Sequence, residues 1–246
     1  MRFCQFNKFP KTDHKTHKIL IIGDGLAEGF GGSINMLKDS GISNSLKKKL
    51  YADKRINQTW YIINRGYFKS TSEQWLPDTT EKPEHLSMLF KKNLWNTNLE
   101  NERLNDAEIV LIVLGNHDQY SKKKELRGNP LVTVNNLKTV ITSLLGKGKI
   151  VSAAYLLPPK NSKNHVIDFK NKLLKKLYSE LKQDYPSQFF EGPQLYNRVY
   201  QKFERLSDGF HFNSDAYEYI ANIWYDIIVN EIVKIQWKFW KEFLQK

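Results

Sequence analysis

The sequence contains a single cysteine, Cys4, among its 246 residues. One thiol can form neither an intrachain disulfide framework nor a multi-cysteine metal site, so we expect a reducing compartment. Residues 1–18 lack the apolar core of a secretory signal, and no apolar run anywhere is long enough to span a bilayer. We therefore expect an intracellular protein without a transmembrane segment. The excess of basic residues in 1–18 fits a mitochondrial address, with the cytoplasm as the alternative.

Acidic residues are scarce relative to basic ones. The chain has 26 Asp and Glu against 38 Lys and Arg, which gives a net charge of +12. Such a charge suits an anionic partner. The lysines are spread along the chain, however, and no helix-turn-helix, zinc-finger or aromatic RNA-binding signature accompanies them. Nucleic acid is therefore the minor alternative, and an anionic protein partner in a larger assembly is the favoured interpretation.

Short apolar runs alternate with helical patterns along most of the sequence. A run of β-branched residues and leucine this short is typical of a strand buried on both faces, as in a parallel sheet. The expected strands are 19–22, 60–64, 108–114, 149–154 and 188–190. The expected helices are one beginning near Ser43, 84–94, 131–145, 166–181 and one beginning at Asn213 and Ser214. This order predicts a three-layer α/β/α sandwich with a parallel, roughly five-stranded, flavodoxin-like sheet. We divide the chain into an N-terminal extension (1–17), one α/β domain (18–230) and an aromatic helical extension (231–246).

Polar and glycine-rich stretches follow the expected strands or precede the last helix. Ligands of parallel sheets lie beyond the carboxyl ends of the strands, so these stretches are candidates for one site. They are Gly23-Asp-Gly-Leu26, Asn64-Arg-Gly66, Gly115-Asn-His-Asp118 and Asp208-Gly-Phe-His211.

The order and spacing of these four stretches resemble the SGNH (GDSL-type) hydrolases, from Ile19 to about Ile227. In that family the first block is Gly-Asp-Ser-Leu, whose serine is the nucleophile, and the second supplies a glycine N–H. The third block, Gly-x-Asn-Asp, supplies an asparagine side chain, and the last, Asp-x-x-His, supplies a base and the aspartate that orients it. The resemblance implies that Asp208 and His211 form a retained catalytic dyad and that Gly66 belongs to the oxyanion hole.

Two departures from the family pattern change the expected chemistry. Gly25 stands at the nucleophile position and has no side chain, and loss of the nucleophile from a triad costs roughly 10⁶ in turnover. When Gly115 and Asp118 are aligned with the third block, His117 takes the place of the asparagine and Asn116 is displaced by one residue. The candidate oxyanion-hole residues are therefore Gly25, Gly66, Asn116 and His117. Neither Ser33 nor Cys4 is placed to replace the serine.

Two other families share fragments of these stretches. Gly-Asn-His-Asp occurs in calcineurin-like metallophosphoesterases, but the chain lacks the further ligands of a two-metal site, so we predict no metal. A dinucleotide fold needs a third glycine where this chain has Glu28, and it lacks the ribose-binding carboxylate. We therefore predict no cofactor.

The C-terminal extension is rich in large apolar side chains: Trp237, Phe239, Trp240 and Phe243. They either pack back on the domain or form a patch for a protein partner or a membrane surface. Together with the missing nucleophile and the basic charge, they favour a pseudoenzyme of the SGNH esterase family that acts as a structural or interaction subunit. The alternative is an ester or acetyl hydrolase, either with its serine replaced by engineering or using water activated by His211.

Overall fold

The computed structural model describes residues 16–29, 41–53, 59–78, 93–100, 106–157, 165–196 and 212–233. Its centre is a five-stranded sheet in the order β2-β1-β3-β4-β5, and every neighbouring pair of strands is parallel. The strands are β1 (Thr16–Gly23), β2 (Thr59–Gly66), β3 (Ile109–Val113), β4 (Ile150–Ala153) and β5 (Phe189–Glu191). The predicted parallel sheet is confirmed.

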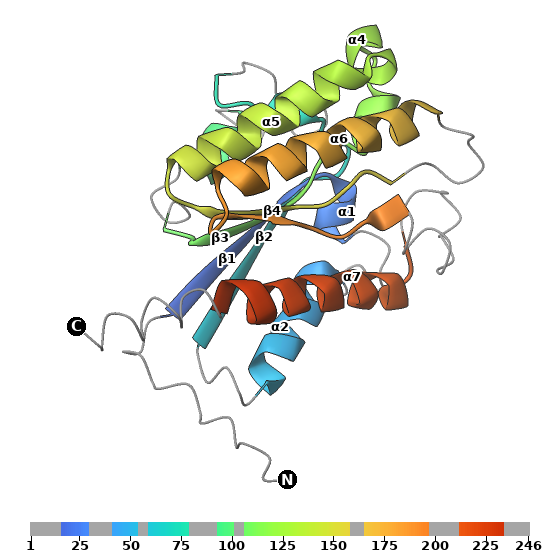
Figure 1. Ribbon diagram of the computed structural model, residues 1–246. Coiled ribbons are helices and arrows are strands. Elements are labelled where there is room, and N and C mark those ends of the chain that lie inside the picture. The colour runs from blue at the N-terminus through green and yellow to red at the C-terminus, as the bar shows by residue number, and fades with distance from the viewer. Residues whose placement is uncertain are drawn as a thin grey trace, which may run out of the picture.

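Helices cover both faces of this sheet (Figure 1). One face carries α2 (Ile42–Ala52) and α7 (Ser214–Ile227), and the other carries α5 (Pro130–Gly146) and α6 (His165–Asp184). Shorter elements complete the described chain: α1 (Gly25–Glu28), η1 (Ser72–Trp75), α3 (Leu94–Asn98), η3 (His117–Tyr120), α4 (Lys124–Gly128) and the π-helical η5 (Ile228–Val233). The three-layer α/β/α architecture is therefore confirmed.

β3 is apolar throughout, and β1 is apolar from Ile19 to Ile22, because both faces of these strands are covered. Successive side chains of a strand point to opposite faces. Ile19 and Ile21 accordingly pack with α2 and α7, whereas Leu20 and Ile22 pack with α5 and α6, and all four are fully buried. Burial on both faces explains why the sequence shows a continuous apolar run instead of an alternating pattern.

Two of the long helices, α5 and α7, begin at side-chain caps. The Asn129 side chain accepts from the Leu131 N–H, with Pro130 at the first helical position of α5. The Asn213 side chain accepts from the Ala216 N–H at the start of α7, which confirms the predicted helix start. Of the helix expected over 84–94, residues 84–92 lie outside the described residues, and α3 begins at Leu94.

Within the described residues, no helix is both long enough and apolar enough to cross a membrane. The aromatic residues of the C-terminal extension and most of the N-terminal extension lie outside the described residues. The proposed domain boundaries therefore stay predictions.

Candidate functional site

The candidate site begins where β1 ends. At Gly23 the chain turns with φ 144°, and a Cβ there would lie 1.8 Å from the carbonyl oxygen of Val113. Only glycine fits this close approach of β1 to β3. The next N–H, that of Asp24, donates to the same carbonyl at 2.9 Å. The turn is thereby fixed against β3, and α1 starts directly after it.

Asp24 is a fully buried carboxylate at the N-terminus of α1. Its Oδ1 accepts from the Leu26 N–H at 3.1 Å, and its Oδ2 accepts from the Asn116 N–H at 2.9 Å and from Asn116 Nδ2 at 3.0 Å. Burial away from water raises the pKa of Asp24 to about 7, against the lowering effect of these three hydrogen bonds. Asp24 therefore joins the first and third sequence blocks.

Gly25 is the first residue of α1 and is buried. The described glycines with positive φ are Gly23, Gly29, Gly115 and Gly148, so Gly25 has a backbone conformation that other residues adopt without strain. A side chain at this position would extend from the start of α1, at the carboxyl edge of the sheet.

Gly66 ends β2 and touches the backbone of α1. A Cβ on Gly66 would lie 2.1 Å from the Glu28 nitrogen, so the position admits no side chain. The Gly66 N–H donates to Oδ1 of Asn64 at 2.8 Å, and Nδ2 of Asn64 donates to the Ala27 carbonyl at 2.8 Å. The N–H that the family resemblance assigns to the oxyanion hole thus already has an acceptor within the chain.

Asn116 and His117 lie side by side in sequence but differ in their contacts. The Asn116 side chain is buried, with Nδ2 on Asp24 and Oδ1 accepting from the Leu157 N–H at 2.8 Å. The His117 ring lies 5.8 Å from that of Phe68, edge to face, and 5.9 Å from that of Tyr120. Asn116 therefore connects the end of β1 to the segment after β4, whereas the His117 ring lies beside two aromatic rings.

Asp118 anchors the third block to the helical layer behind it. Its Oδ1 accepts from the Ser72 N–H at 2.8 Å, and its Oδ2 accepts from Ser72 Oγ at 2.6 Å and Thr133 Oγ1 at 2.7 Å. Nζ of Lys170 donates to Thr133 Oγ1 at 2.8 Å, and the Lys170 side chain is fully buried. Burial raises the pKa of Asp118 and lowers that of Lys170, while the attraction between the two charges opposes both changes.

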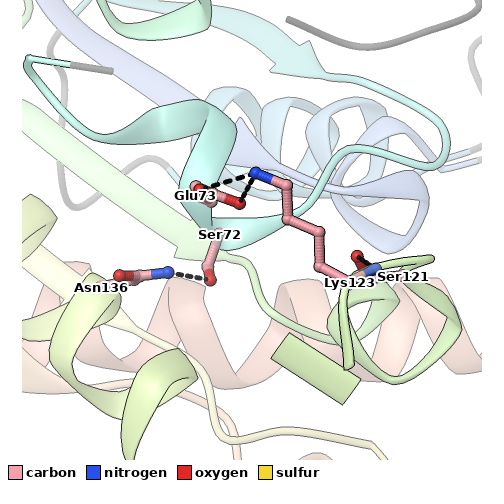
Figure 2. Close-up of polar contacts among 5 residues, drawn as sticks. All are labelled: Ser72, Glu73, Ser121, Lys123 and Asn136. Carbon is pink, nitrogen blue, oxygen red and sulfur yellow. Dashed lines mark hydrogen bonds and ion pairs between the residues drawn. The ribbon is translucent and has the colours of Figure 1, made fainter. Parts of the chain in front are cut away.

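Further polar contacts connect η1 and the segment after η3 to their surroundings (Figure 2). Nδ2 of Asn136 donates to Ser72 Oγ at 2.9 Å. Nζ of Lys123 forms an ion pair with both carboxylate oxygens of Glu73, at 2.9 and 3.0 Å. The Lys123 N–H donates to Ser121 Oγ at 3.1 Å. η1, α5 and the segment after η3 are therefore connected to one another.

Lys69 occupies a strained turn after β2. Its φ is 60°, the one positive value among the described residues other than glycine. The Ser70 N–H donates to the Tyr67 carbonyl at 3.0 Å, which makes Lys69 the third residue of a type II turn, a position that glycine normally fills. No residue pattern around Lys69 predicts this conformation.

The structure brings Gly25, Gly66, Asn116 and His117 to one edge of the sheet, as the sequence predicted for parallel strands. Asp208 and His211 lie outside the described residues, as do Ser33 and Cys4. The proposed dyad and the proposed oxyanion-hole roles therefore stay predictions. Within the described part of the chain, no three histidine, cysteine or acidic residues are grouped so that they could hold a metal ion.

Sequence comparison finds no matching family model and no matching curated protein. Comparison with solved structures finds esterases. The psychrotrophic esterase EstA from Pseudoalteromonas sp. aligns at a TM-score of 0.55 with 20% identity, over 87% of this chain and 97% of that one. The aryl esterase of M. smegmatis aligns at 0.59 with 17% identity, over 87% and 99%.

A third similar structure is that of a protein assigned to the lipolytic G-D-S-L family, from Desulfitobacterium hafniense DCB-2. It aligns at a TM-score of 0.54 with 14% identity, over 85% of this chain and 98% of that one. Almost the whole of each neighbour is matched. This chain has the fold of the SGNH hydrolases.

Proposed function

We propose that this protein is a catalytically degenerate SGNH hydrolase-like protein that acts as a structural or interaction subunit of a larger intracellular assembly. One observation carries the proposal. Gly25 follows β1 and Asp24 directly and begins α1, at the position where the resembling family has its nucleophilic serine. Without a side chain at this position, no acyl-enzyme can form there.

The hydrogen bonds of the neighbouring groups support the same proposal. An oxyanion hole needs donors aimed at the developing charge, and losing one typically costs about 10²–10³ in rate. The Gly66 N–H donates to Asn64, and the Asn116 amide donates to Asp24. These two donors therefore already have acceptors within the described residues.

The charge of the chain supports an interaction role. A net charge of +12 favours association with an acidic partner and disfavours close approach of identical copies. The aromatic C-terminal extension adds a second candidate surface. A mitochondrial location is proposed on the basic residues of 1–18 alone.

The alternative function is ester hydrolysis, favoured by the esterases among the solved neighbours. In that case Gly25 would stand in for a serine removed by engineering, or water activated by His211 would attack the ester. Both versions require Asp208 and His211 to act as a dyad.

Hydrolysis of p-nitrophenyl acetate and butyrate by the full chain separates these functions. We expect no turnover above buffer for the unmodified protein, and little or none for Gly25→Ser. Because Gly25 has no positive φ, a serine there adds no backbone strain. An inactive Gly25→Ser variant would therefore point to the lack of oxyanion-hole donors. The double variant Gly25→Ser/His117→Asn restores the family's asparagine, and labelling by a fluorophosphonate reports on a reactive serine.

Two results would overturn the proposal. Ester turnover by the unmodified protein, abolished by His211→Ala, would show a working enzyme that uses activated water. Robust activity of the single variant Gly25→Ser would show intact machinery and would favour an inactivated enzyme over a scaffold.

A further inference from the structure

Among the described residues, β2 forms one edge of the sheet and pairs with β1 on its inner side only. The pairing is unbroken over eight residues, from Thr16 opposite Thr59 to Gly23 opposite Gly66. Natural proteins protect such an edge with proline, lysine, a bulge or a very short strand. The sequence of β2, Thr-Trp-Tyr-Ile-Ile-Asn-Arg-Gly, has no proline or lysine, and its register has no bulge.

The outer side of β2 carries backbone groups that form no hydrogen bonds to the rest of the described chain. The Tyr67 N–H donates to the Gly23 carbonyl, so by alternation Tyr61, Ile63 and Arg65 direct their backbone groups toward β1. Those of Ile62 and Asn64 point outward. In the part of the chain that the structure describes, neither backbone group of these two residues has a partner.

Two outward groups of β2 do have partners. The Gly66 N–H donates to Oδ1 of Asn64 at 2.8 Å, and the other pair marks where the open stretch begins. The Trp60 carbonyl accepts from the Tyr51 hydroxyl at 2.8 Å. Tyr51 lies in the last turn of α2, which packs beside β2. The open stretch therefore runs from just after Trp60 to Asn64.

Three side chains of the open stretch are largely apolar and accessible, and the fourth is the amide of Asn64. Tyr61 is 56% exposed, and Ile62 and Ile63 are partly exposed. On an added strand, aromatic and β-branched residues opposite these side chains would add favourable cross-strand contacts. The backbone groups give hydrogen bonds and the side chains give apolar contacts, which is the usual basis of strand addition.

Cations stand at both ends of the open stretch. Arg65 lies on β2 itself and is exposed. At the other end, Nζ of Lys47 lies over the Tyr51 ring, 5.9 Å from its centroid. β2 contains no acidic residue. A second copy of the chain would bring another net charge of +12 to this edge, whereas an acidic strand would complement it.

We propose that the outer edge of β2 is a docking surface for an extended acidic segment of a partner protein, which adds to the sheet as a sixth strand. The proposal rests on the interaction role proposed above, for which it names the kind of partner. It does not depend on whether Gly25 inactivates the site. The ester-hydrolysis assays test that point separately.

A synthetic probe of the expected chemistry tests this docking surface on the full chain. The probe is a fluorescein-labelled octapeptide of alternating valine and threonine with glutamate at both ends, and binding is followed by fluorescence anisotropy. A peptide with lysine at both ends is the charge control. We expect saturable binding of the acidic peptide, weakened by salt, and about three- to tenfold weaker binding of the basic one.

Two further peptides test whether the backbone makes the contact. Both have the acidic sequence, with alternate nitrogens methylated along one edge or along the other. Strand addition uses the N–H groups of one edge only, so one methylated peptide should lose binding and the other should keep it. Hydrogen exchange of the protein should show the same alternation: the Ile62 and Asn64 amides gain protection on binding, and those of Tyr61 and Ile63 are protected beforehand.

A charge reversal on β2 tests whether the positive charge of Arg65 favours the acidic peptide over the basic one. Arg65→Glu should weaken the acidic peptide about three- to tenfold and strengthen the basic one. Arg127→Glu, an equivalent change at an exposed arginine of α4, should alter neither. Circular dichroism checks that both variants are folded.

The proposal fails if no peptide binds saturably, if both methylated peptides bind as well as the parent, or if Ile62 gains no protection. It also fails if the free protein dimerises in analytical ultracentrifugation and Tyr61→Lys abolishes the dimer while Tyr120→Lys does not. That result would make a second copy the occupant of the edge.

Discussion

The strongest test of the site's electrostatics is the substitution Asp24→Asn. It keeps the size of the side chain but removes the charge and places an NH₂ group among three donors, from Leu26 and Asn116. Two effects oppose each other at this carboxylate. Burial disfavours the charge, whereas the three donors favour it, and burial wins because the pKa of Asp24 is raised from 3.8 to about 7.

The sign of the pH dependence follows from that direction. A native pKa above the unfolded value means that the native state binds the proton more tightly. The contribution of Asp24 to stability is then fully present below about pH 4 and is lost as the pH rises through about 7. From about pH 5 to about pH 8 it falls by roughly 3 kcal/mol, since each unit of pKa shift corresponds to about 1.4 kcal/mol.

Urea unfolding at a series of pH values measures this fall. The fluorescence of four buried tryptophans, Trp60, Trp75, Trp95 and Trp224, reports the transition. The difference in free energy of unfolding between the unmodified protein and Asp24→Asn should be largest near pH 5, in favour of the unmodified protein. This difference should shrink toward pH 8. Other titrating groups contribute equally to both proteins and cancel in the difference.

The control is Asp184→Asn, at an exposed carboxylate at the end of α6, which reports the general effect of removing one negative charge. A gap that stays constant or widens as the pH rises would refute the reasoning. It would mean that the three hydrogen bonds outweigh burial and that Asp24 is ionised throughout.

Three further predictions concern stability and are measured by the same urea titrations at neutral pH. Lys170→Ala leaves a buried partner charge and a cavity and should lower the free energy of unfolding by about 3–5 kcal/mol. Lys170→Met keeps the volume and removes the charge, so it should cost less than Lys170→Ala but still destabilise; a Lys170→Met variant as stable as the unmodified protein would contradict a role for the charge. Gly66→Ala drives a Cβ into the α1 backbone and should lower the free energy of unfolding by about 3 kcal/mol. The control Gly146→Ala, where nothing lies within 4 Å of the new Cβ, should change it by less than about 1 kcal/mol. Similar costs for the two variants would refute the close packing at Gly66. Lys69→Gly should stabilise the protein by about 0.5 kcal/mol. It relieves a backbone strain of about 1–2 kcal/mol, which exceeds the cost of about 0.5–1 kcal/mol from the greater freedom of glycine in the unfolded chain. A loss of stability would show that the lysine side chain contributes more than the strain costs.

The sequence predicted the strands well because apolar runs and buried strands coincide in a parallel sheet. The expected run 19–22 lies within β1, and the run 108–114 contains β3. The helices over 131–145 and 166–181 were each found slightly longer, as α5 and α6. The short elements α1, η1 and η3 were missed, because one turn of helix has too few residues to show a period.

Within the candidate site, the sequence indicated which segments meet but not what their side chains do. Gly25 and Gly66 were placed correctly at one edge, since parallel strands bring their carboxyl ends together. The capture of the Gly66 N–H by Asn64 depends on rotamers and a turn, which no spacing encodes. Burial of Lys170 had a detectable signal: it lies three residues after Ile167 and four before Leu174, on the apolar face of α6.

The order of pairing in the sheet has a consequence for how the chain folds as it is made. β1 is an early strand, yet its inner partner β3 comes much later, with Ile19 opposite Ile109. The apolar face of α2 is buried later still during synthesis, because it is covered by α7, near the end of the described chain. Contacts so distant in sequence form slowly, since a long loop must close before they are made. A nascent chain that has emerged only as far as β4 would therefore still expose the apolar face of α2, and shortening the chain before α7 should leave this layer open to aggregation.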